Sequence, residues 1–317
     1  MSFPKIYKEP FSVDILFKDL EKGAKELNAP FCAEVTKKML QAFEKEFTDG
    51  HIQFRVSSLD KSLLNYRILC LYDVDWLKRI EESNIFPSTF TENRAAKLLR
   101  EVKTKFPQAL YLGNDFDAVH GLKKVYMIFP KPILFDQLLT LQNLPPALTN
   151  DSKKLKGCGF NQVVICAVDF VSESVNIYFV WQNANVDWMQ NFTKVMNTGE
   201  ISRELCDTII KSAPVHGSLA TTWSYEKEQI LRWCIYTLGL RYDRPEMYEK
   251  VGELAGCVLP ERHERFLQFD KAVGSCTDKI AYGLGWSFGN PCPYCKYERS
   301  YTKDILKEYQ TQIDSYD

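Results

Sequence analysis

Two cysteines, Cys292 and Cys295 in the stretch PCPYCKYERSY, have the spacing of a redox-active dithiol or of one half of a zinc site. A thioredoxin-like domain carries such a pair near its N-terminus, but here only residues 296–317 follow it. No second C-x2-C pair and no H-x3-H pair completes a zinc site, because the other cysteines and the histidines are scattered. We therefore expect the two thiols to be incidental and Lys296, which follows them, to be the functional residue.

Basic residues recur in the middle of strand-like segments. Residues two apart in a strand share a face, so these side chains can point into one interior if the outer face is apolar. Like charges a few Å apart repel strongly at the effective dielectric of a protein, so such a cluster predicts a polyanionic ligand, and Arg and Lys are the usual partners of phosphate. The residues of this predicted cationic site are Arg55, Arg67, Lys124, Arg232 and Lys296.

Amide and aromatic residues accompany the cations on the same strands. They are Asn65, Tyr126, Asn176, Tyr178 and, on the fourth strand pair, Trp223. A cation held over an aromatic ring gains about 0.5–2 kcal/mol, so an aromatic wall beside a phosphate pocket suits a substrate that becomes a carbocation. The chain contains neither GxxxxGK[ST] nor GxGxxG, which argues against a nucleotide cradle at a helix N-terminus.

Two acidic pairs, Asp73–Asp75 and Asp115–Asp117, are the nearest approach to the metal-binding carboxylates of terpene synthases and isoprenyl elongation enzymes. Both pairs are short and lie beside predicted strands, where aspartates are more typical of turns and helix starts. The sequence therefore favours neither of these magnesium-dependent classes. A non-catalytic barrel that binds an anionic lipid stays open as an alternative.

The elements that must position these residues form a repeat. Five predicted strand pairs recur at intervals of roughly 50–65 residues, with amphipathic helices between them. The pairs occupy residues 51–72, 108–130, 162–182, 214–238 and 278–301. The helices are predicted at 12–27, with Ser12 as N-cap, and at 33–47, 73–83, 92–106, 135–144, 187–196, 201–212, 244–256, 262–274 and 303–313.

This pattern predicts an α+β fold in one domain, residues 1–317. Hairpins make antiparallel neighbours, and ten such strands close into a barrel that has no exposed edges and is wide enough to hold a ligand. We therefore expect a single ten-stranded antiparallel β-barrel, built from five α-β-β-α repeats with an outer ring of helices. Its apolar outer face is predicted to include Tyr66, Ile68, Val125, Met127, Val175, Ile177 and Phe179.

The composition fits this interpretation. The 317 residues are 45% hydrophobic and carry a net charge of −1, which argues against a nucleic-acid-binding protein. The N-terminal segment is charged throughout, no run reaches the length of a membrane-spanning helix, and most of the 10 cysteines lie in apolar stretches. We expect a soluble, cytoplasmic monomer without a disulfide framework, whose partners are small molecules.

The order of these repeats and the segments KKVYMIFP, VNIYF and QILRWC resemble the soluble aromatic prenyltransferases of the ABBA, or PT-barrel, fold. This group includes the clorobiocin-type and naphterpin-type enzymes and their fungal relatives. The resemblance spans nearly the whole chain. It implies transfer of an isoprenoid group from an allylic diphosphate to an electron-rich aromatic ring.

The resemblance also implies roles for individual residues. Lys124, Asn176, Tyr178, Arg232 and Lys296 match the family's diphosphate-binding positions, and Tyr126 and Tyr178 match its shield around the allyl cation. The magnesium-dependent member has an aspartate where this chain has Asn65, and the magnesium-independent members have an arginine at the position of Arg67. We therefore expect no cofactor and no requirement for Mg²⁺, with Arg67 and Arg55 neutralising the leaving group.

The chain departs from the family pattern around the acceptor. A tyrosine expected on the fourth hairpin falls at Ala220, and we expect the nearby Trp223 to complete the shield. The residues expected to contact the acceptor are Glu298, Val164 and Ser218. Val164 stands where the clorobiocin-type enzymes have an arginine, which predicts a neutral acceptor such as a phenol or hydroxynaphthalene. Dimethylallyl diphosphate is the expected donor, with geranyl diphosphate as the alternative.

Overall fold

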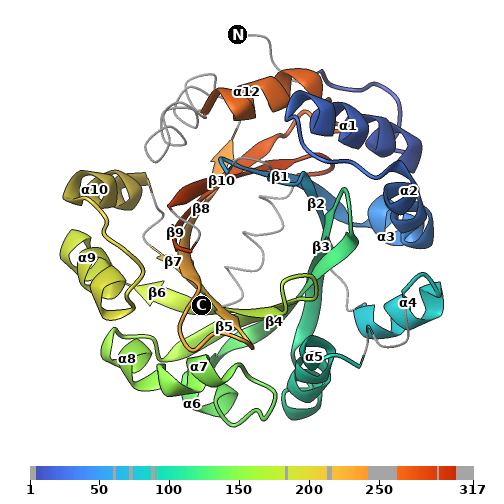
Figure 1. Ribbon diagram of the computed structural model, residues 1–317. Coiled ribbons are helices and arrows are strands. Elements are labelled where there is room, and N and C mark those ends of the chain that lie inside the picture. Colours follow the sequence, from blue (N-terminus) through green and yellow to red (C-terminus); the bar gives the residue numbers. More distant parts are fainter. Residues whose placement is uncertain are drawn as a thin grey trace.

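Ten strands form a closed barrel around which the helices are arranged (Figure 1). The computed structural model describes residues 5–59, 62–70, 74–86, 90, 92–182, 185–212, 216–241, 263–290 and 293–304. Each strand pairs antiparallel with its neighbours, in the order β1-β10-β9-β8-β7-β6-β5-β4-β3-β2. The predicted ten-stranded barrel is therefore confirmed.

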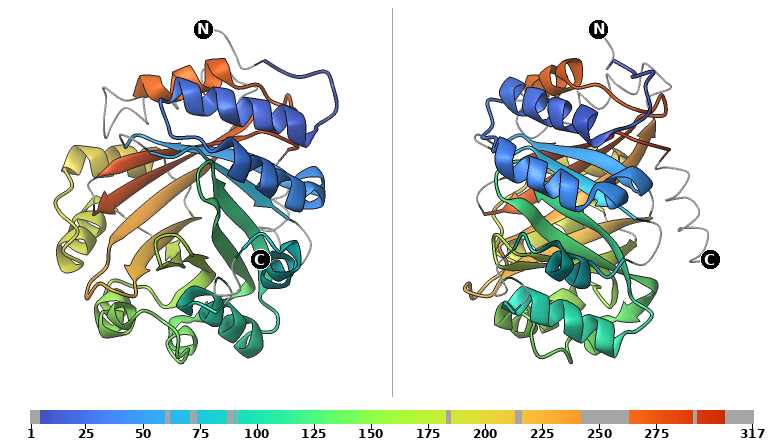
Figure 2. Two further views of the ribbon diagram at one scale, coloured as in Figure 1. Left: turned by 45° about the vertical axis from the view of Figure 1, so that its right-hand side comes forward. Right: turned by 90° about the vertical axis from the view of Figure 1, so that its right-hand side faces the viewer.

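Each hairpin begins within a few residues of its predicted position. The strands are β1 His51–Ser57, β2 Asn65–Leu69, β3 Leu110–Asp117, β4 Gly121–Leu134, β5 Gln162–Asp169, β6 Ser174–Gln182, β7 His216–Ser224, β8 Arg232–Arg241, β9 Ala281–Gly289 and β10 Tyr294–Ser300. The strands are tilted with respect to the barrel axis, as the side views show (Figure 2), and this tilt lets a twisted sheet close on itself.

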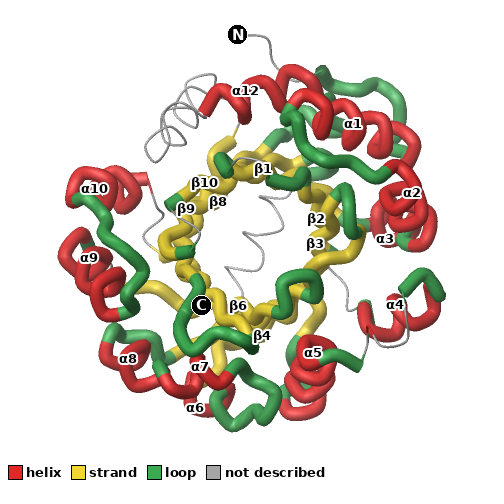
Figure 3. The backbone as a smooth tube through the Cα atoms, viewed as in Figure 1, coloured by secondary structure: helices red, strands yellow, loops and turns green. Residues whose placement is uncertain are grey.

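The helices lie outside the strands and surround them (Figure 3). The described helices are α1 Val13–Glu26, α2 Ala33–Ala42, α3 Glu44–Asp49, α4 Trp76–Ser83, α5 Arg94–Lys105, α6 Phe135–Leu138, α7 Pro146–Asn150, α8 Ser152–Gly157, α9 Val186–Val195, α10 Arg203–Ser212 and α12 His263–Ala272. No helix in these described segments is long and apolar enough to cross a membrane.

The local sequence explains where several helices begin. The Ser12 side chain accepts a hydrogen bond from the Ile15 amide, so the predicted N-cap of α1 is confirmed. Asp75 caps α4 in the same way. The helix predicted at 33–47 is interrupted at Phe43, which leaves helical geometry between α2 and α3. The helices predicted at 244–256 and 303–313 lie outside the described residues, apart from Lys303 and Asp304, which are not helical.

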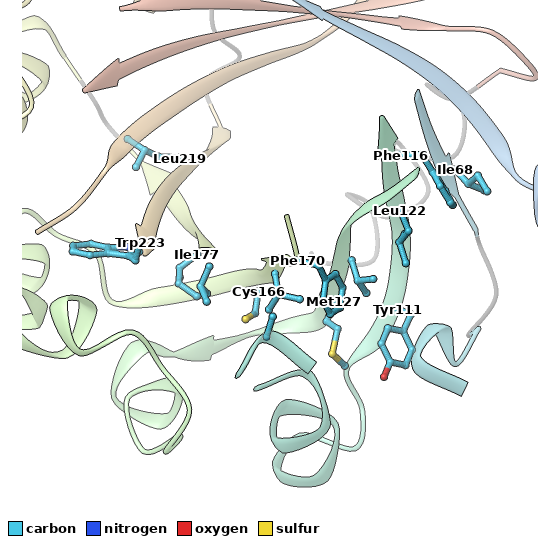
Figure 4. Packing of buried hydrophobic residues seen from close by; sticks show 14 of the residues in the cluster. Ile68, Tyr111, Phe116, Leu122, Met127, Cys166, Phe170, Ile177, Leu219 and Trp223 are labelled. Atoms are coloured by element: carbon cyan, nitrogen blue, oxygen red, sulfur yellow. The ribbon is translucent and has the colours of Figure 1, made fainter. Parts of the chain in front are cut away.

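The hydrophobic core lies between the barrel and its coat of helices. All seven apolar residues predicted to face outward are buried in it, and Figure 4 shows Ile68, Met127 and Ile177 among the outward-pointing side chains. Because side chains alternate along a strand, burying these residues outside directs their neighbours into the barrel. The outer core thereby determines which residues line the lumen.

Candidate functional site

A second, smaller cluster of buried residues lies inside the barrel and forms its apolar lining. Its members come from most of the strands: Leu69, Leu112, Tyr126, Ala167, Tyr178, Ala220, Cys234, Tyr236 and Ala281, with Ile128, Val164 and Ile165 packed against them. Several of these residues are small. The lumen therefore combines aromatic walls with space between them.

Two arginines and two carboxylates form a network on one side of the lumen. Arg55 of β1 contacts Asp115 of β3 at 2.8 Å (Nη1 to Oδ2) and Glu298 of β10 at 2.7 Å (Nε to Oε1). Arg67 of β2 contacts the same two carboxylates, at 2.5 Å (Nε to Asp115 Oδ1) and 3.4 Å (Nη1 to Glu298 Oε2). The Tyr126 hydroxyl donates to Asp115 Oδ2 at 2.6 Å. The network fixes two positive charges in the lumen and balances them with two negative ones.

This network corrects one expectation drawn from the sequence. Arg55 and Arg67 do lie in the lumen, but Asp115 and Glu298 compensate their charges. The sequence did not predict this, because Asp115 was assigned to a turn. Only Asp117 has that role: its carboxylate accepts the backbone N–H groups of Val119 and His120 in the β3–β4 turn. Asp115 lies two positions earlier in the strand, directly opposite Arg67. Strand alternation applied to β3 could have revealed it.

A second group of polar residues lies on neighbouring strands. Lys124 of β4 donates to Asn176 Oδ1 at 3.1 Å, and Asn176 of β6 donates to the Thr222 hydroxyl at 2.9 Å. Thr222 of β7 is the Cα partner of Arg232, the first residue of β8. The structure therefore brings Lys124, Asn176 and Arg232 together along one part of the wall, as the sequence predicted.

The two cations of this group, Lys124 and Arg232, have few close hydrogen-bond or ion-pair partners among the described residues. Among the described residues, the nearest carboxylate to Lys124 is that of Asp169, at 3.8 Å. Burial lowers the pKa of Lys124 from 10.5 to about 7, outweighing the attraction of Asp169 and Asp115, and the positive charges of Arg232 and Arg55 act in the same direction. The Nε atom of Arg232 is buried and has no hydrogen-bond partner within the described part of the chain. Such groups are ready to receive an anion.

Lys296 of β10 adds a third cation next to tyrosines. Its Nζ donates to the Tyr236 hydroxyl at 3.2 Å and lies 5.3 Å from the centre of the Tyr236 ring and 5.6 Å from that of Tyr294. Burial would raise the pKa of Tyr294, but the charges of Lys296 and Arg232 outweigh it and lower that pKa. The electrostatic effect on Tyr294 shows that both cations act on the same region of the lumen.

Three tyrosines form an aromatic wall between the two charged groups. The rings of Tyr126 and Tyr178 are 6.3 Å apart, and that of Tyr236 stacks on Tyr178 at 6.1 Å with an angle of 22°. The Arg67 guanidinium lies 4.8 Å from the centre of the Tyr126 ring. Burial raises the pKa of all three phenols well above 10, so they stay neutral and keep their protons.

The prediction for Trp223 is wrong. Its side chain lies on the outer face of β7, in the core beneath the helices (Figure 4), and its indole N–H donates to Thr221. The reason is strand parity, since Ala220 and Thr222 face the lumen and Trp223 must then face outward. Tyr236, which the sequence reasoning missed, provides the ring beside Ala220. The alternation of Arg232, Cys234 and Tyr236 along β8 was the available signal.

The expected acceptor contacts fall in different places. Val164 packs against the lumen cluster beside a shift in register between β5 and β6. Glu298 faces the lumen, bound to both arginines. The backbone of Ser218 pairs with Val180, but its side chain lies outside the described residues. Of the cysteine pair, Cys295 is buried, with its Sγ 3.6 Å from the Lys296 carbonyl oxygen, and Cys292 lies outside the described residues.

The residues around Asn65 and Asp115 do not fit a magnesium ion. Guanidinium and phenol groups occupy both oxygens of Asp115, whereas magnesium needs carboxylate oxygens and water around it. Asn65 donates its amide N–H to the Leu63 carbonyl instead of offering a carboxylate. The positive charge in this part of the lumen comes from Arg55 and Arg67.

Comparisons with known proteins agree with this geometry. Residues 11–312 match the family described as aromatic prenyltransferase Orf2. An aromatic prenyltransferase of Sclerotinia sclerotiorum is 25% identical over 299 residues, covering 93% of each chain. The 4-hydroxyphenylpyruvate 3-dimethylallyltransferase of Streptomyces niveus is 25% identical over 293 residues, covering 91% of this chain and 84% of the relative. A solved structure of 5-dimethylallyl tryptophan synthase from Streptomyces coelicolor, in complex with DMASPP and Trp, has a similar fold, with a TM-score of 0.55. The two sequences are 10% identical, and the match covers 93% of this chain and 96% of the other.

Proposed function

The chain belongs to the aromatic prenyltransferase Orf2 family, and we propose that it transfers a dimethylallyl group from dimethylallyl diphosphate to a phenol or hydroxynaphthalene-like acceptor. The dimethylallyl donor is supported by the name of the relative from Streptomyces niveus, whose acceptor, 4-hydroxyphenylpyruvate, carries a phenol. The protein is accordingly a transferase of prenyl groups.

The observation that carries this proposal is the arrangement of cations and aromatic rings within the lumen. Lys124 has Asp169 at 3.8 Å as its ion-pair partner, Nε of Arg232 is buried without a hydrogen-bond partner among the described residues, and Lys296 contacts the Tyr236 hydroxyl. The wall of Tyr126, Tyr178 and Tyr236 lies next to them. A diphosphate bound to the three cations places the attached allyl group against the rings.

In the proposed mechanism, the cations bind the diphosphate and stabilise the negative charge that grows on the leaving oxygen as the C–O bond breaks. Asn176 orients Lys124, and Tyr178 stands beside the donor. The electron pair of the broken bond stays on the diphosphate, and the allyl cation forms against the tyrosine faces, which exclude the water that would quench it. An aromatic carbon held about 3–3.5 Å away then attacks. The arenium loses its proton to water or diphosphate.

The proposed reaction does not require a metal ion. Asp115 and Glu298 hold the guanidinium groups of Arg55 and Arg67 rigidly, with exposed fractions of 15% and 11%. Fixed charges of this kind stabilise an ionising donor without reorganising during the reaction. Because Asp115 and Glu298 balance the charges of these two arginines, we propose that Lys124, Arg232 and Lys296 supply most of the positive charge that a magnesium ion would provide, with Arg55 and Arg67 fixed beside them.

The acceptor is proposed to bind toward the apolar part of the lumen. Val164 and the cluster around it offer apolar contact, which suits a neutral ring. We propose that Glu298, which faces the lumen, and Ser218 meet a hydroxyl group of the acceptor. This favours a phenol over a carboxylate-bearing acceptor.

Mass spectrometry of products tests the proposed function. The purified protein is incubated with dimethylallyl diphosphate and a panel of phenols and dihydroxynaphthalenes, once with EDTA and once with Mg²⁺. We expect an acceptor to gain C5H8 in both conditions. Product only with Mg²⁺ would contradict the metal-independent mechanism, and no product with any acceptor in either condition would contradict the transferase assignment.

A further inference from the structure

Tyr236 lies in the lumen next to the Tyr178 ring and to the small residues Cys234 and Gly285. Its ring stacks on that of Tyr178, whose partner on the intervening strand β7 is Ala220. Ala220 is in turn the partner of Cys234 on β8. Tyr236, Tyr178, Ala220 and Cys234 all belong to the lumen cluster. One large side chain therefore fills space that its neighbours leave open.

The Tyr236 ring packs against the backbone of Gly285 in β9. Gly285 is the Cα partner of both Tyr236 and Lys296. A Cβ atom at this position would lie 2.9 Å from Cδ1 and Cε1 of Tyr236 and 3.2 Å from the Cys234 sulfur, closer than packed carbon atoms tolerate. The ring can lie against the strand only because residue 285 has no side chain. It is held at its other end by the hydrogen bond from Lys296.

We propose that Tyr236, seated on Gly285, limits the donor to a five-carbon chain. This inference rests on the proposed function, because it assumes that the diphosphate binds at Lys124, Arg232 and Lys296. The Tyr236 hydroxyl contacts Lys296, so the ring begins where the diphosphate site ends. An allyl group extending from that site meets the ring after a short distance. Removing the ring joins its volume to the space beside Ala220, Cys234 and Gly285, which can then accept a second isoprene unit.

The test compares the affinities of two unreactive donor analogues, dimethylallyl and geranyl S-thiolodiphosphate, and of inorganic diphosphate, by isothermal titration calorimetry. The variants are Tyr236→Ala, which removes the ring, and Tyr236→Phe, which keeps the ring and loses only the hydroxyl. Tyr236→Leu serves as a second variant that lacks the ring, in case the alanine protein does not fold. Circular dichroism verifies the fold of each.

We expect the wild type and Tyr236→Phe to prefer the dimethylallyl analogue by a similar ratio. In Tyr236→Ala or Tyr236→Leu that ratio should move toward the geranyl analogue by about tenfold or more, the scale on which an apolar pocket discriminates chain size. The affinity of Tyr236→Ala and Tyr236→Leu for inorganic diphosphate should match that of Tyr236→Phe, because all three variants lack the hydroxyl that contacts Lys296. An unchanged ratio in the variants without the ring would overturn the inference. If the wild type binds inorganic diphosphate and neither analogue, this inference fails while the diphosphate site stands; if it binds none of the three, the proposed function fails.

Discussion

At the scale of single residues, the lumen contains two kinds of positive charge. Arg55 and Arg67 are each bound to Asp115 and Glu298 within hydrogen-bond distance. In the described part of the chain, the nearest carboxylate to Lys124 is that of Asp169, at 3.8 Å. The paired arginines have fixed positions and a fixed charge, whereas Lys124 can change its protonation state near neutral pH. The two kinds of cation should therefore respond differently to ligand and to pH.

Diphosphate binding should be accompanied by proton uptake at Lys124. Because the pKa of this lysine is lowered to about 7 in the free protein, it is mostly neutral at pH 8, and a bound anion favours its charged form. Titration of inorganic diphosphate at pH 8, in buffers with different ionisation enthalpies, should show uptake approaching one proton. The Lys124→Arg variant, which stays charged, should take up none at this position. Equal uptake by both proteins would contradict the assignment to Lys124.

The same lysine should make the stability of the free protein depend on pH. Its pKa is 10.5 in the unfolded chain and about 7 in the folded one, so between these values the unfolded state binds more protons. The free energy of unfolding from this group therefore rises as the pH increases from about 7 to about 10. Urea unfolding across this range should show a smaller rise for Lys124→Met than for the wild type. A Lys124→Met curve as steep as that of the wild type would show that another group is responsible.

Removing one carboxylate of the network should destabilise the fold. Asp115→Asn leaves Arg55 and Arg67 with one carboxylate between them, and breaking a buried ion pair from one side costs about 3 kcal/mol of unfolding free energy. Asp187→Asn is the matched control, because Asp187 forms an exposed pair with Arg203 and its loss should cost about 0.5 kcal/mol or less. Urea unfolding measures both. Similar costs for the two variants would show that the network contributes little.

At the scale of elements, β10 connects the lumen to the outer layer of helices. Lys296 and Glu298 point inward. Arg299 of the same strand points outward, toward α12, and forms a buried ion pair with Asp270 of that helix at 3.0 Å. Arg299 also donates to the Gly274 carbonyl after α12. The register that places Lys296 and Glu298 inside the barrel is therefore held from the outside by Arg299.

Breaking this outer pair should weaken the attachment of α12. Arg299→Met leaves the Asp270 carboxylate buried without its cation and should lower the free energy of unfolding by about 3–5 kcal/mol. The double variant Arg299→Met with Asp270→Leu removes the stranded charge, so it should be more stable than the single variant. Both can be measured by urea unfolding. A double variant less stable than the single one would show that the hydrogen bonds of Arg299, and not its ion pair, hold the helix.

At the scale of the whole molecule, the repeat of strand pairs and helices was enough to predict the barrel, because the period-2 pattern and helix stripes are local properties of the sequence. The same alternation placed Lys124, Asn176 and Lys296 in the lumen. It failed for Trp223 because a single step in register moves a side chain to the other face. Asp115 and Tyr236 follow the same alternation along β3 and β8, but Asp115 was assigned to a turn, and the partners that give both residues their roles come from strands distant in sequence.

The lumen cations are proposed to bind the diphosphate of the donor. Calorimetric titration of inorganic diphosphate into the wild type, Arg232→Ala and Arg203→Ala tests this proposal most directly. Arg203 is the matched control, because it lies on α10 with 69% of its side chain exposed. We predict that Arg232→Ala weakens binding by about tenfold or more, the effect of losing a hydrogen bond between charged groups, and that Arg203→Ala binds like the wild type. Equal affinity of all three folded proteins would contradict the account.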